Sequence, residues 1–384
     1  MKKVLLIDTA FAAMPIYDYL VKQEEFDVWV MGNRANDALA LIAGDKWIEQ
    51  DYSKVEEVKQ HLQNHNIGFV VPGCTDVSIE TCLQLGVNSQ AFDSSETYDS
   101  IGNKNEFREL CELLKLPSPK VIDIKDFPKK GKFICKPVDA FSGNGVAIVD
   151  GEDTEALNKA YKNAVNESRT KNALIEEYVD GQLYSFSVFL EEHNVKDFFI
   201  VKEGSSVNPY AVDTSYVDNS LEESVLVNLQ ESIEKLSRHL ELKNGLLHTQ
   251  FILSNNMPYI IELSRRCPGD LYPYLIESST GFQYAAKYAS YFINKHQSSL
   301  CKYTKHIVRH TIASKETTRF LNLKFINEMQ TYAYFPLLAL GSRVEKNQKT
   351  RVGILFTESL SYKTLVSDYE QYIKRSVYVL DQLK

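Results

Sequence analysis

Residues 248–270 read HTQFILSNNMPYIIELSRRCPGD, two apolar runs around an asparagine-rich segment, and this pattern predicts a β-hairpin. The runs contain β-branched and aromatic residues, whereas the segment 254–258 is typical of a turn. If the turn centres near Asn256, Gln250 lies opposite Glu262. An amide and a carboxylate would then face each other across the two strands.

Five polar residues of the hairpin would share one face, because side chains alternate along a strand. They are His248, Gln250, Glu262, Ser264 and Arg266. Opposed Cβ atoms lie about 5 Å apart, so Gln250 and Glu262 could bind one Mg²⁺. Magnesium with so few protein ligands takes further oxygens from phosphates and water, so the hairpin indicates a nucleotide. Arg266 would lie beside it as a fork for phosphate or carboxylate.

The hairpin alone leaves a structural interpretation open. Glu262 follows the apolar run 258–261, and a buried carboxylate needs a partner. Arg265 and Arg266 supply positive charge, so a structural ion pair competes with the metal site. An ordinary core hairpin with Gln250 and Glu262 in solvent is the third interpretation.

Length and composition indicate a globular protein of two or three domains, with 384 residues, 44% of them hydrophobic and 24% charged. The net charge is -8, and no long basic block occurs, so nucleic acid is not an expected partner. The N-terminus reads as a first strand and no apolar run approaches the roughly 20 residues that span a bilayer, so we expect a cytoplasmic protein without a membrane partner. The six cysteines show no CxxC spacing and suit reduced thiols.

The first 95 residues predict a parallel sheet, because short apolar strands alternate with helical segments. The expected strands are 4–7, 27–31 and 68–72, with a helix over 53–64. The first turn lacks GxGxxG, which argues against a dinucleotide-dependent oxidoreductase. Residues after the strand ends could still bind a small molecule; the candidates are Arg34, Gly73, Thr75 and Asp76.

The middle of the chain predicts a second domain with mixed elements. Helices are expected over 104–115, where Asn103 can cap the first turn, over 155–165, and around the leucine stripe from Leu226 to Leu240. Strands are expected over 132–137 and 146–149. The remainder alternates apolar and polar residues around 333–340 and 352–356, typical of a small antiparallel lobe. We therefore divide the chain into domains 1–95, 96–300 and 301–384.

Two further segments suit a nucleotide. Lys136 ends a strand before a loop with Ser142, Gly143 and Gly145, whose backbone N–H groups could approach phosphates. Plain turn glycines explain that loop about equally well. The segment 174–181 begins apolar and then presents two acids, which suits an adenine hinge or simply a strand that leaves the core.

Taken in order, these motifs resemble those of the ATP-grasp superfamily, and most of all carbamoyl phosphate synthetase large-subunit-like proteins, over about residues 1–300. The resemblance implies an α/β fold: an N-terminal Rossmann-like parallel sheet, an α+β ATP-grasp domain and a β-rich C-terminal lobe. It implies that Lys104 and Lys136 contact the nucleotide and that Ser142, Gly143 and Gly145 form the phosphate loop. Glu176, Glu177 and Val179 fall on the adenine hinge. Gln250, Glu262 and Ser264 fall on metal-ligand positions, and Arg266 on the family's arginine.

The sequence departs from the family pattern at three places. Ser264 replaces an asparagine after the second metal ligand, which puts a second metal contact in doubt. Gln250 replaces an acid, as in the carbamoyl phosphate synthetase branch, and leaves Glu262 as the only anion expected on that face. The acid that often follows the hinge glycine is missing, which leaves Glu177 to serve the ribose.

By resemblance the protein is an ATP-dependent carboxylate–amine ligase that activates a carboxylate as an acylphosphate and joins it to an amine. ATP and Mg²⁺, or Mn²⁺, would be its cofactors, with Lys136 and Arg266 as catalytic residues. The substrates would be a small carboxylate and an amine. The family suggests an amino acid as one of them, but a sugar acid or a specialised metabolite is equally compatible, and a homodimer is common in the superfamily. Another ATP-grasp reaction, carboxylation or phosphotransfer, and a non-catalytic ATP-binding regulator are the alternatives.

Overall fold

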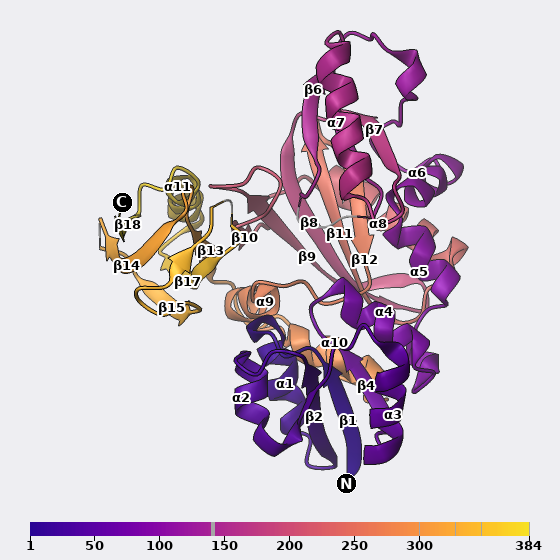
Figure 1. Ribbon diagram of the computed structural model, residues 1–384, viewed down its shortest axis with the longest axis vertical. Coiled ribbons are helices and arrows are strands. Elements are labelled where there is room, and N and C mark those ends of the chain that lie inside the picture. The colour runs from indigo at the N-terminus through magenta and orange to yellow at the C-terminus, as the bar shows by residue number, and fades with distance from the viewer. Residues whose placement is uncertain (140–142, 299, 327, 347, 384) are drawn as a thin grey trace.

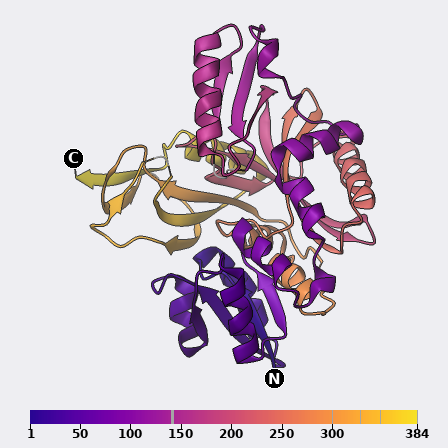
Figure 2. The same cartoon turned by 45° about the vertical axis from the view of Figure 1, so that its right-hand side comes forward.

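The computed structural model describes residues 1–139, 143–298, 300–326, 328–346 and 348–383. Figure 1 shows the N-terminal elements at one end of a large central sheet and a small sheet with its helix at the other end. The C-terminal strands extend the large sheet to one side. Figure 2, turned by 45°, keeps the same arrangement.

The N-terminal part is a four-stranded parallel sheet in the order β3-β2-β1-β4, as the alternating pattern predicted. Its strands are β1 (Lys2–Ile7), β2 (Phe26–Gly32), β3 (Trp47–Glu49) and β4 (Phe69–Pro72). Its helices are α1 (Met14–Val21), α2 (Ala38–Ala43), α3 (Val55–His65) and α4 (Asp76–Gln84). The last four residues of β1 are fully buried, the near-continuous apolar run of a strand covered on both faces. Among the strands only the short β3 was not predicted from the sequence, and among the four helices only α3 was predicted.

Two helices and a small sheet follow. The helices are α5 (Ser95–Gly102) and α6 (Lys104–Leu113). Asn103 caps α6, because its side chain accepts hydrogen bonds from two backbone N–H groups of the first turn. The small sheet has the order β6-β5-β7, with β5 (Lys132–Pro137), β6 (Ala147–Asp150), β7 (Ala173–Glu177) and the covering helix α7 (Thr154–Glu167).

The large sheet has eight strands in the order β12-β11-β8-β9-β10-β13-β17-β15. They are β8 (Gln182–Glu191), β9 (Asn194–Gly204), β10 (Thr214–Val217), β11 (Gly245–Ser254), β12 (Met257–Ser264), β13 (His306–Ala313), β15 (Thr331–Pro336) and β17 (Arg351–Ser359). Strands beyond residue 300 thus continue the large sheet through β10, which pairs with β13. The boundary at residue 300 stays a prediction.

The remaining elements cover or flank this sheet. The helices are α8 (Glu223–His239), α9 (Tyr272–Thr280), α10 (Tyr284–Phe292) and α11 (Tyr362–Ile373), with four 3₁₀ turns at Phe11–Ala13, Gly44–Lys46, Ser89–Ala91 and Ile124–Asp126. A third sheet has the order β16-β14-β18, from β14 (Thr318–Phe325), β16 (Arg343–Val344) and β18 (Tyr378–Leu383). No helix in the described ranges has the length and apolar character of a membrane span.

The two faces of the large sheet differ in chemistry. One face of β8 packs with the leucine stripe of α8, so that stripe belongs to the core as expected. The other face carries Ser185 and Ser187, whose hydroxyls bond the hydroxyls of Tyr272 in α9 and Tyr284 in α10. Polar side chains on this second face are therefore buried under the two helices.

The hairpin of β11 and β12 reaches the predicted register by an unpredicted route. Its turn is Asn255–Asn256, both with positive φ, and Ser254 pairs with Met257. Continued without a break, this register would place Gln250 opposite Ile261. A β-bulge shifts the register between Phe251 and Gln250, so Gln250 pairs with Glu262. The predicted pairing is confirmed.

Gly181 lets the segment before β8 lie against the end of β11. A Cβ built on Gly181 would overlap the carbonyl oxygen of Leu253. We expect Gly181→Ala to lower the free energy of unfolding by about 1–3 kcal/mol, because backbone cannot yield as a flexible side chain can. Urea denaturation would measure it.

Gly68→Ala is the matched control, since a Cβ at Gly68 meets no atom within 4 Å. We expect its unfolding midpoint to stay near that of the unsubstituted protein. Equal midpoints for the two variants would show that the close approach at Gly181 carries no cost.

Candidate nucleotide and metal site

A buried charge cluster joins the small sheet to α6. Lys136 Nζ lies 2.6 Å from Glu176 Oε2, and Arg108 Nε lies 2.7 Å from Glu176 Oε1. All three residues are buried. The Glu176 carboxylate is thus held by two cations, and it does not project from the hinge as the resemblance led us to expect.

Arg108 also reaches the hairpin. Its Nη2 donates to the carbonyl oxygen of Ile261 at 2.8 Å, and Ile261 is the residue that the bulge leaves unpaired. One guanidinium therefore connects the strand that carries Glu176 with the strand that carries Glu262. Arg108 Nη1 is buried and has no hydrogen-bond partner among the described residues.

Burial and charge set the pKa values of this cluster. Burial lowers the pKa of Lys136 to about 8; Glu176 opposes the shift, whereas the charges of Arg108 and Lys104 add to it. Burial alone would raise the pKa of Glu176, but the charges of Lys136 and Arg108 outweigh it and lower that pKa. The carboxylate is therefore ionised, and Lys136 is a cation that can lose its proton in mildly alkaline solution.

The hinge and the phosphate loop flank this cluster. Glu177 and Val179 are half-buried at the end of β7, so both remain open to a ligand. Gly143 and Gly145 have φ of +73° and +72°, a conformation that favours glycine. A Cβ on Gly143 would overlap Tyr210, so this loop touches the segment after β9. Ser142 lies outside the described residues.

The metal-ligand candidates lie on one face of the hairpin, as predicted. Gln250 pairs with Glu262, and His248 pairs with Ser264. The Glu262 side chain is exposed, not buried, and it forms no hydrogen bond or ion pair with any residue in the described ranges. An exposed carboxylate beside an amide oxygen is the hard-oxygen donor set that suits Mg²⁺.

The structural ion pair left open by the sequence does not form. Arg265 Nε lies 2.6 Å from Asp93 Oδ2. Arg266 binds Asp76 with two contacts, Nε to Oδ1 at 2.7 Å and Nη2 to Oδ2 at 3.0 Å. Both arginines are therefore paired with carboxylates of the N-terminal part and not with Glu262.

His248 lies between the hairpin and the helices. Its Nδ1 is 2.6 Å from the Ser187 hydroxyl, and its ring packs edge-on against Tyr272. Burial, helped by the charge of Arg266, lowers the pKa of His248 to about 3. The imidazole is therefore neutral near pH 7 and serves as a hydrogen-bonding group.

Sequence reasoning missed Glu203, which the structure brings to the metal candidates. Glu203 Oε2 accepts a hydrogen bond of 2.7 Å from Gln250 Nε2, and the residue is buried. Burial raises the pKa of Glu203 to about 7, against hydrogen bonds from Ser185 and Gln250 and the charge of Arg309. The nearby hydrogen bonds and positive charge therefore do not make up for the loss of water around the Glu203 carboxylate. Arg108 was missed as well, although its spacing of four residues from Lys104 places both on one face of α6.

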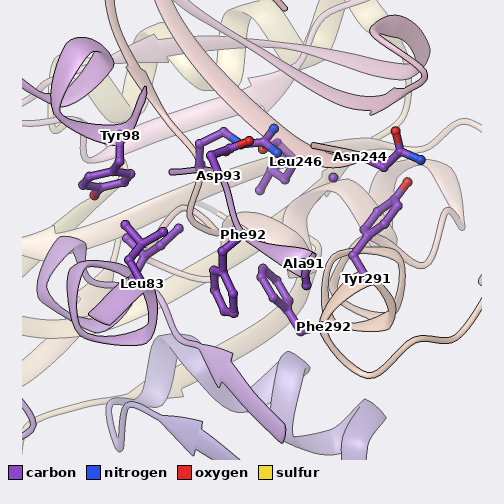
Figure 3. Close-up of a pocket in the computed structure, with 12 residues that line it drawn as sticks. Leu83, Ala91, Phe92, Asp93, Tyr98, Asn244, Leu246, Tyr291 and Phe292 are labelled. Atoms are coloured by element: carbon purple, nitrogen blue, oxygen red, sulfur yellow. The ribbon is translucent and has the colours of Figure 1, made fainter. Parts of the chain in front are cut away.

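Two cavities lie away from these residues. The cavity in Figure 3, of about 10 Å³, lies between Phe92, Phe292 and the Asp93–Arg265 pair and could hold one water at most. A larger one, of about 250 Å³, lies where β10 and β13 meet the end of α9. Neither is lined by a predicted nucleotide or metal residue.

Comparison with known proteins fits this geometry. The family model of the ATP-grasp domain matches residues 130–273, which include the small sheet, the hinge and the hairpin. Residues 130–273 are an ATP-grasp domain.

Relatives and solved structures extend the similarity beyond that domain. The phosphoribosylamine–glycine ligase of Pyrococcus furiosus is 25% identical over 296 residues, covering 69% of this chain and 66% of that enzyme. The chain thus spans just under two thirds of that relative. The L-amino acid ligase from Bacillus licheniformis superposes with a TM-score of 0.79 at 16% identity, covering 100% and 99% of the two chains. Phosphoribosylglycinamide synthetase from Anaerococcus prevotii gives 0.76 at 15% identity over the full length of both.

We expect Arg108→Met to lower the free energy of unfolding by about 3–5 kcal/mol, because it removes one member of a buried charge cluster and frees the Ile261 carbonyl. Chemical denaturation would measure the loss.

The control is Arg238→Met, which removes an exposed arginine paired with Glu234 on α8. Its cost should be at most about 1 kcal/mol. A similar small cost for Arg108→Met would mean that Arg108 does not hold the two strands together.

Proposed function

We propose that this protein is an ATP-dependent carboxylate–amine ligase that works with Mg²⁺. The observation that carries the proposal is the Arg108 connection: it fixes the Lys136–Glu176 cluster beside the strand that pairs Glu262 with Gln250. Phosphoryl transfer needs positioning and charge neutralisation and no protein nucleophile. The cluster and the hairpin together would supply those two requirements.

Different residues of the proposed nucleotide site contact different parts of ATP. Lys136 and Lys104 neutralise phosphate charge, and the loop with Ser142, Gly143 and Gly145 covers the phosphates. Glu177 and the Val179 backbone serve the ribose and the adenine edge. Glu176 acts through Lys136, whose ammonium it holds in place, so we assign it no direct contact with adenine.

The hairpin residues would hold the metal. Gln250 and Glu262 offer an amide oxygen and a carboxylate, and the Ser264 hydroxyl lies two residues further on the same strand. Bound Mg²⁺, or Mn²⁺, would neutralise charge on the β- and γ-phosphates. The exposed Glu262 carboxylate is the anion most open to it.

Arg266 suits the carboxylate substrate. Asp76 accepts hydrogen bonds from Nε and Nη2 and so orients the guanidinium. Nη1 donates a long hydrogen bond of 3.3 Å to the Cys267 carbonyl oxygen and is the nitrogen we assign to the substrate. The γ-phosphoryl group moves to the substrate carboxylate and gives ADP and an acylphosphate. The amine then attacks the acyl carbon, phosphate leaves with the bonding electrons, and the nitrogen loses a proton to give the amide.

We also propose an amino acid as one substrate. The names of two similar proteins, a phosphoribosylamine–glycine ligase and an L-amino acid ligase, each include one. Small molecules are the expected partners, and the homodimer expected from the resemblance remains a proposal. The same holds for the division into domains 1–95, 96–300 and 301–384.

The reaction can be tested with ATP, Mg²⁺ and pooled carboxylates and amines, following ADP and new masses. We expect a product whose mass is the sum of one carboxylate and one amine less water. Lys136→Ala and Glu262→Ala should each lower turnover about 100-fold or more. Arg266→Ala should retain part of the ADP release and lose nearly all amide.

Glu231→Ala is the control, because Glu231 is an exposed glutamate on α8, which packs on the opposite face of the large sheet. It should match the unsubstituted enzyme. Unchanged turnover in Lys136→Ala or Glu262→Ala would refute the site. A carboxylated or phosphorylated product would favour the other ATP-grasp reactions, and nucleotide binding without ADP release would favour a regulator.

The pH profile tests Lys136 separately. We expect kcat/KM for ATP to fall about tenfold per pH unit above pH about 8, because the free enzyme then loses the Lys136 proton. Lys136→Arg keeps its charge and should show no such limb, whatever its absolute rate. The same alkaline limb in Lys136→Arg would assign the titration to another group.

A further inference from the structure

Polar side chains form a row across the large sheet, starting at the metal candidates. Glu262 pairs with Gln250, Gln250 pairs with Ser185, and Ser185 pairs with Val201. Paired residues share a face, and so do residues two apart on one strand. Glu203, two residues after Val201, therefore lies on the same face as Glu262, although the two are 59 positions apart in the sequence.

The contact between Glu203 and Gln250 fixes which way the amide points. A carboxylate accepts hydrogen bonds, so the atom 2.7 Å from Glu203 Oε2 must be the amide nitrogen of Gln250. The amide oxygen then lies on the other side of the group, and it accepts no hydrogen bond from the residues that the structure describes. Of the two ends of the amide, only the oxygen can bind a cation.

Charge gives Glu203 a second effect. Sequence reasoning left Glu262 as the only anion on this face, because Gln250 stands where the family usually has an acid. The Glu203 carboxylate touches that glutamine and is only 4% exposed. In its ionised form it adds a second negative charge to the site from the neighbouring strand β9.

The other groups around Glu203 offset this charge only in part. Ser185 bonds it with a neutral hydroxyl, which in turn bonds Tyr272 at 2.9 Å. The charge of Arg309, on the same face, favours the carboxylate, but the Arg309 Nη1 donates to the carbonyl oxygen of Asp270 at 2.9 Å. Glu203 forms no ion pair within the described residues.

We propose that Glu203 is a positioning residue of the metal site, which turns the Gln250 oxygen towards the divalent cation and supplies the charge that Gln250 lacks. This inference rests on the metal–nucleotide part of the proposed function. If the inference holds, Glu203 and Gln250 act as a pair. A carboxylate at position 250 and an amide at position 203 should then serve the metal about as well as the natural arrangement.

The test measures binding of Mn²⁺ with a non-hydrolysable ATP analogue by electron paramagnetic resonance titration. Glu203→Gln should weaken Mn²⁺ binding about 10–100-fold, because it removes the charge and lets the Gln250 amide turn either way. In steady state the Mg²⁺ concentration for half activity should rise, while KM for ATP at saturating Mg²⁺ should change little. The double variant Glu203→Gln/Gln250→Glu keeps one amide and one carboxylate and should restore most of the affinity.

Glu277→Gln is the matched control, a glutamate of α9 that accepts a backbone hydrogen bond from Ala285 outside the metal face. It should bind Mn²⁺ normally, and thermal melts should show all variants folded, since glutamine is isosteric with glutamate.

Three outcomes would overturn the inference: normal Mn²⁺ affinity in Glu203→Gln, no recovery in the double variant, or no metal binding by the unsubstituted protein with the nucleotide. Intact metal binding without any amide product would instead refute the ligase reaction alone, and the predicted order of affinities among these variants would then still support the role of Glu203.

Discussion

The hydrogen bond from Arg108 to the Ile261 carbonyl connects the hairpin to α6 and, through Glu176, to the small sheet. A bulged residue leaves its backbone groups outside the strand ladder, and the guanidinium satisfies the carbonyl. The same side chain binds Glu176, and Glu176 binds Lys136. The register of the hairpin, the orientation of Lys136 and the position of α6 therefore depend on one another.

A buried cluster of this kind is a costly way to gain stability, because each charge must leave water. Its value here is geometric. Two positive groups and one negative group leave a net positive charge beside the hinge, which suits an anionic ligand such as a nucleotide. Burial, together with the charges of Arg108 and Lys104, lowers the pKa of Lys136 below that of an ordinary lysine. At the metal end the sign reverses, since Glu203 and Glu262 lie close together with Gln250 between them.

Sequence alone predicted much of this arrangement. The parallel N-terminal sheet, the capped helix α6 and the strands of the hairpin follow from local patterns, and the order of motifs led to the ATP-grasp fold. The bulge could not be predicted, because the group that satisfies it comes from a residue 153 positions away. Glu203 could not be recognised from the sequence for a related reason. The pairing of β8 with β9 decides on which face of the sheet Glu203 lies, and a second bulge shifts the register of that pair. The burial of Glu176 depended on Arg108, and no pattern within 174–181 could reveal it.

Arg265 and Arg266 are neighbours in sequence, yet they bind two different carboxylates: Arg265 binds Asp93, which follows α4, and Arg266 binds Asp76, the first residue of α4. The loop after the hairpin is thus fastened at two points to the N-terminal part. The arginine that would meet the substrate takes its position from a domain that supplies none of the predicted nucleotide or metal residues. In a chimera of two such enzymes, the N-terminal domain could not be exchanged as an independent module. Both aspartates would have to be transferred together with the two arginines. These two ion pairs should therefore limit which substitutions either part can accept during evolution.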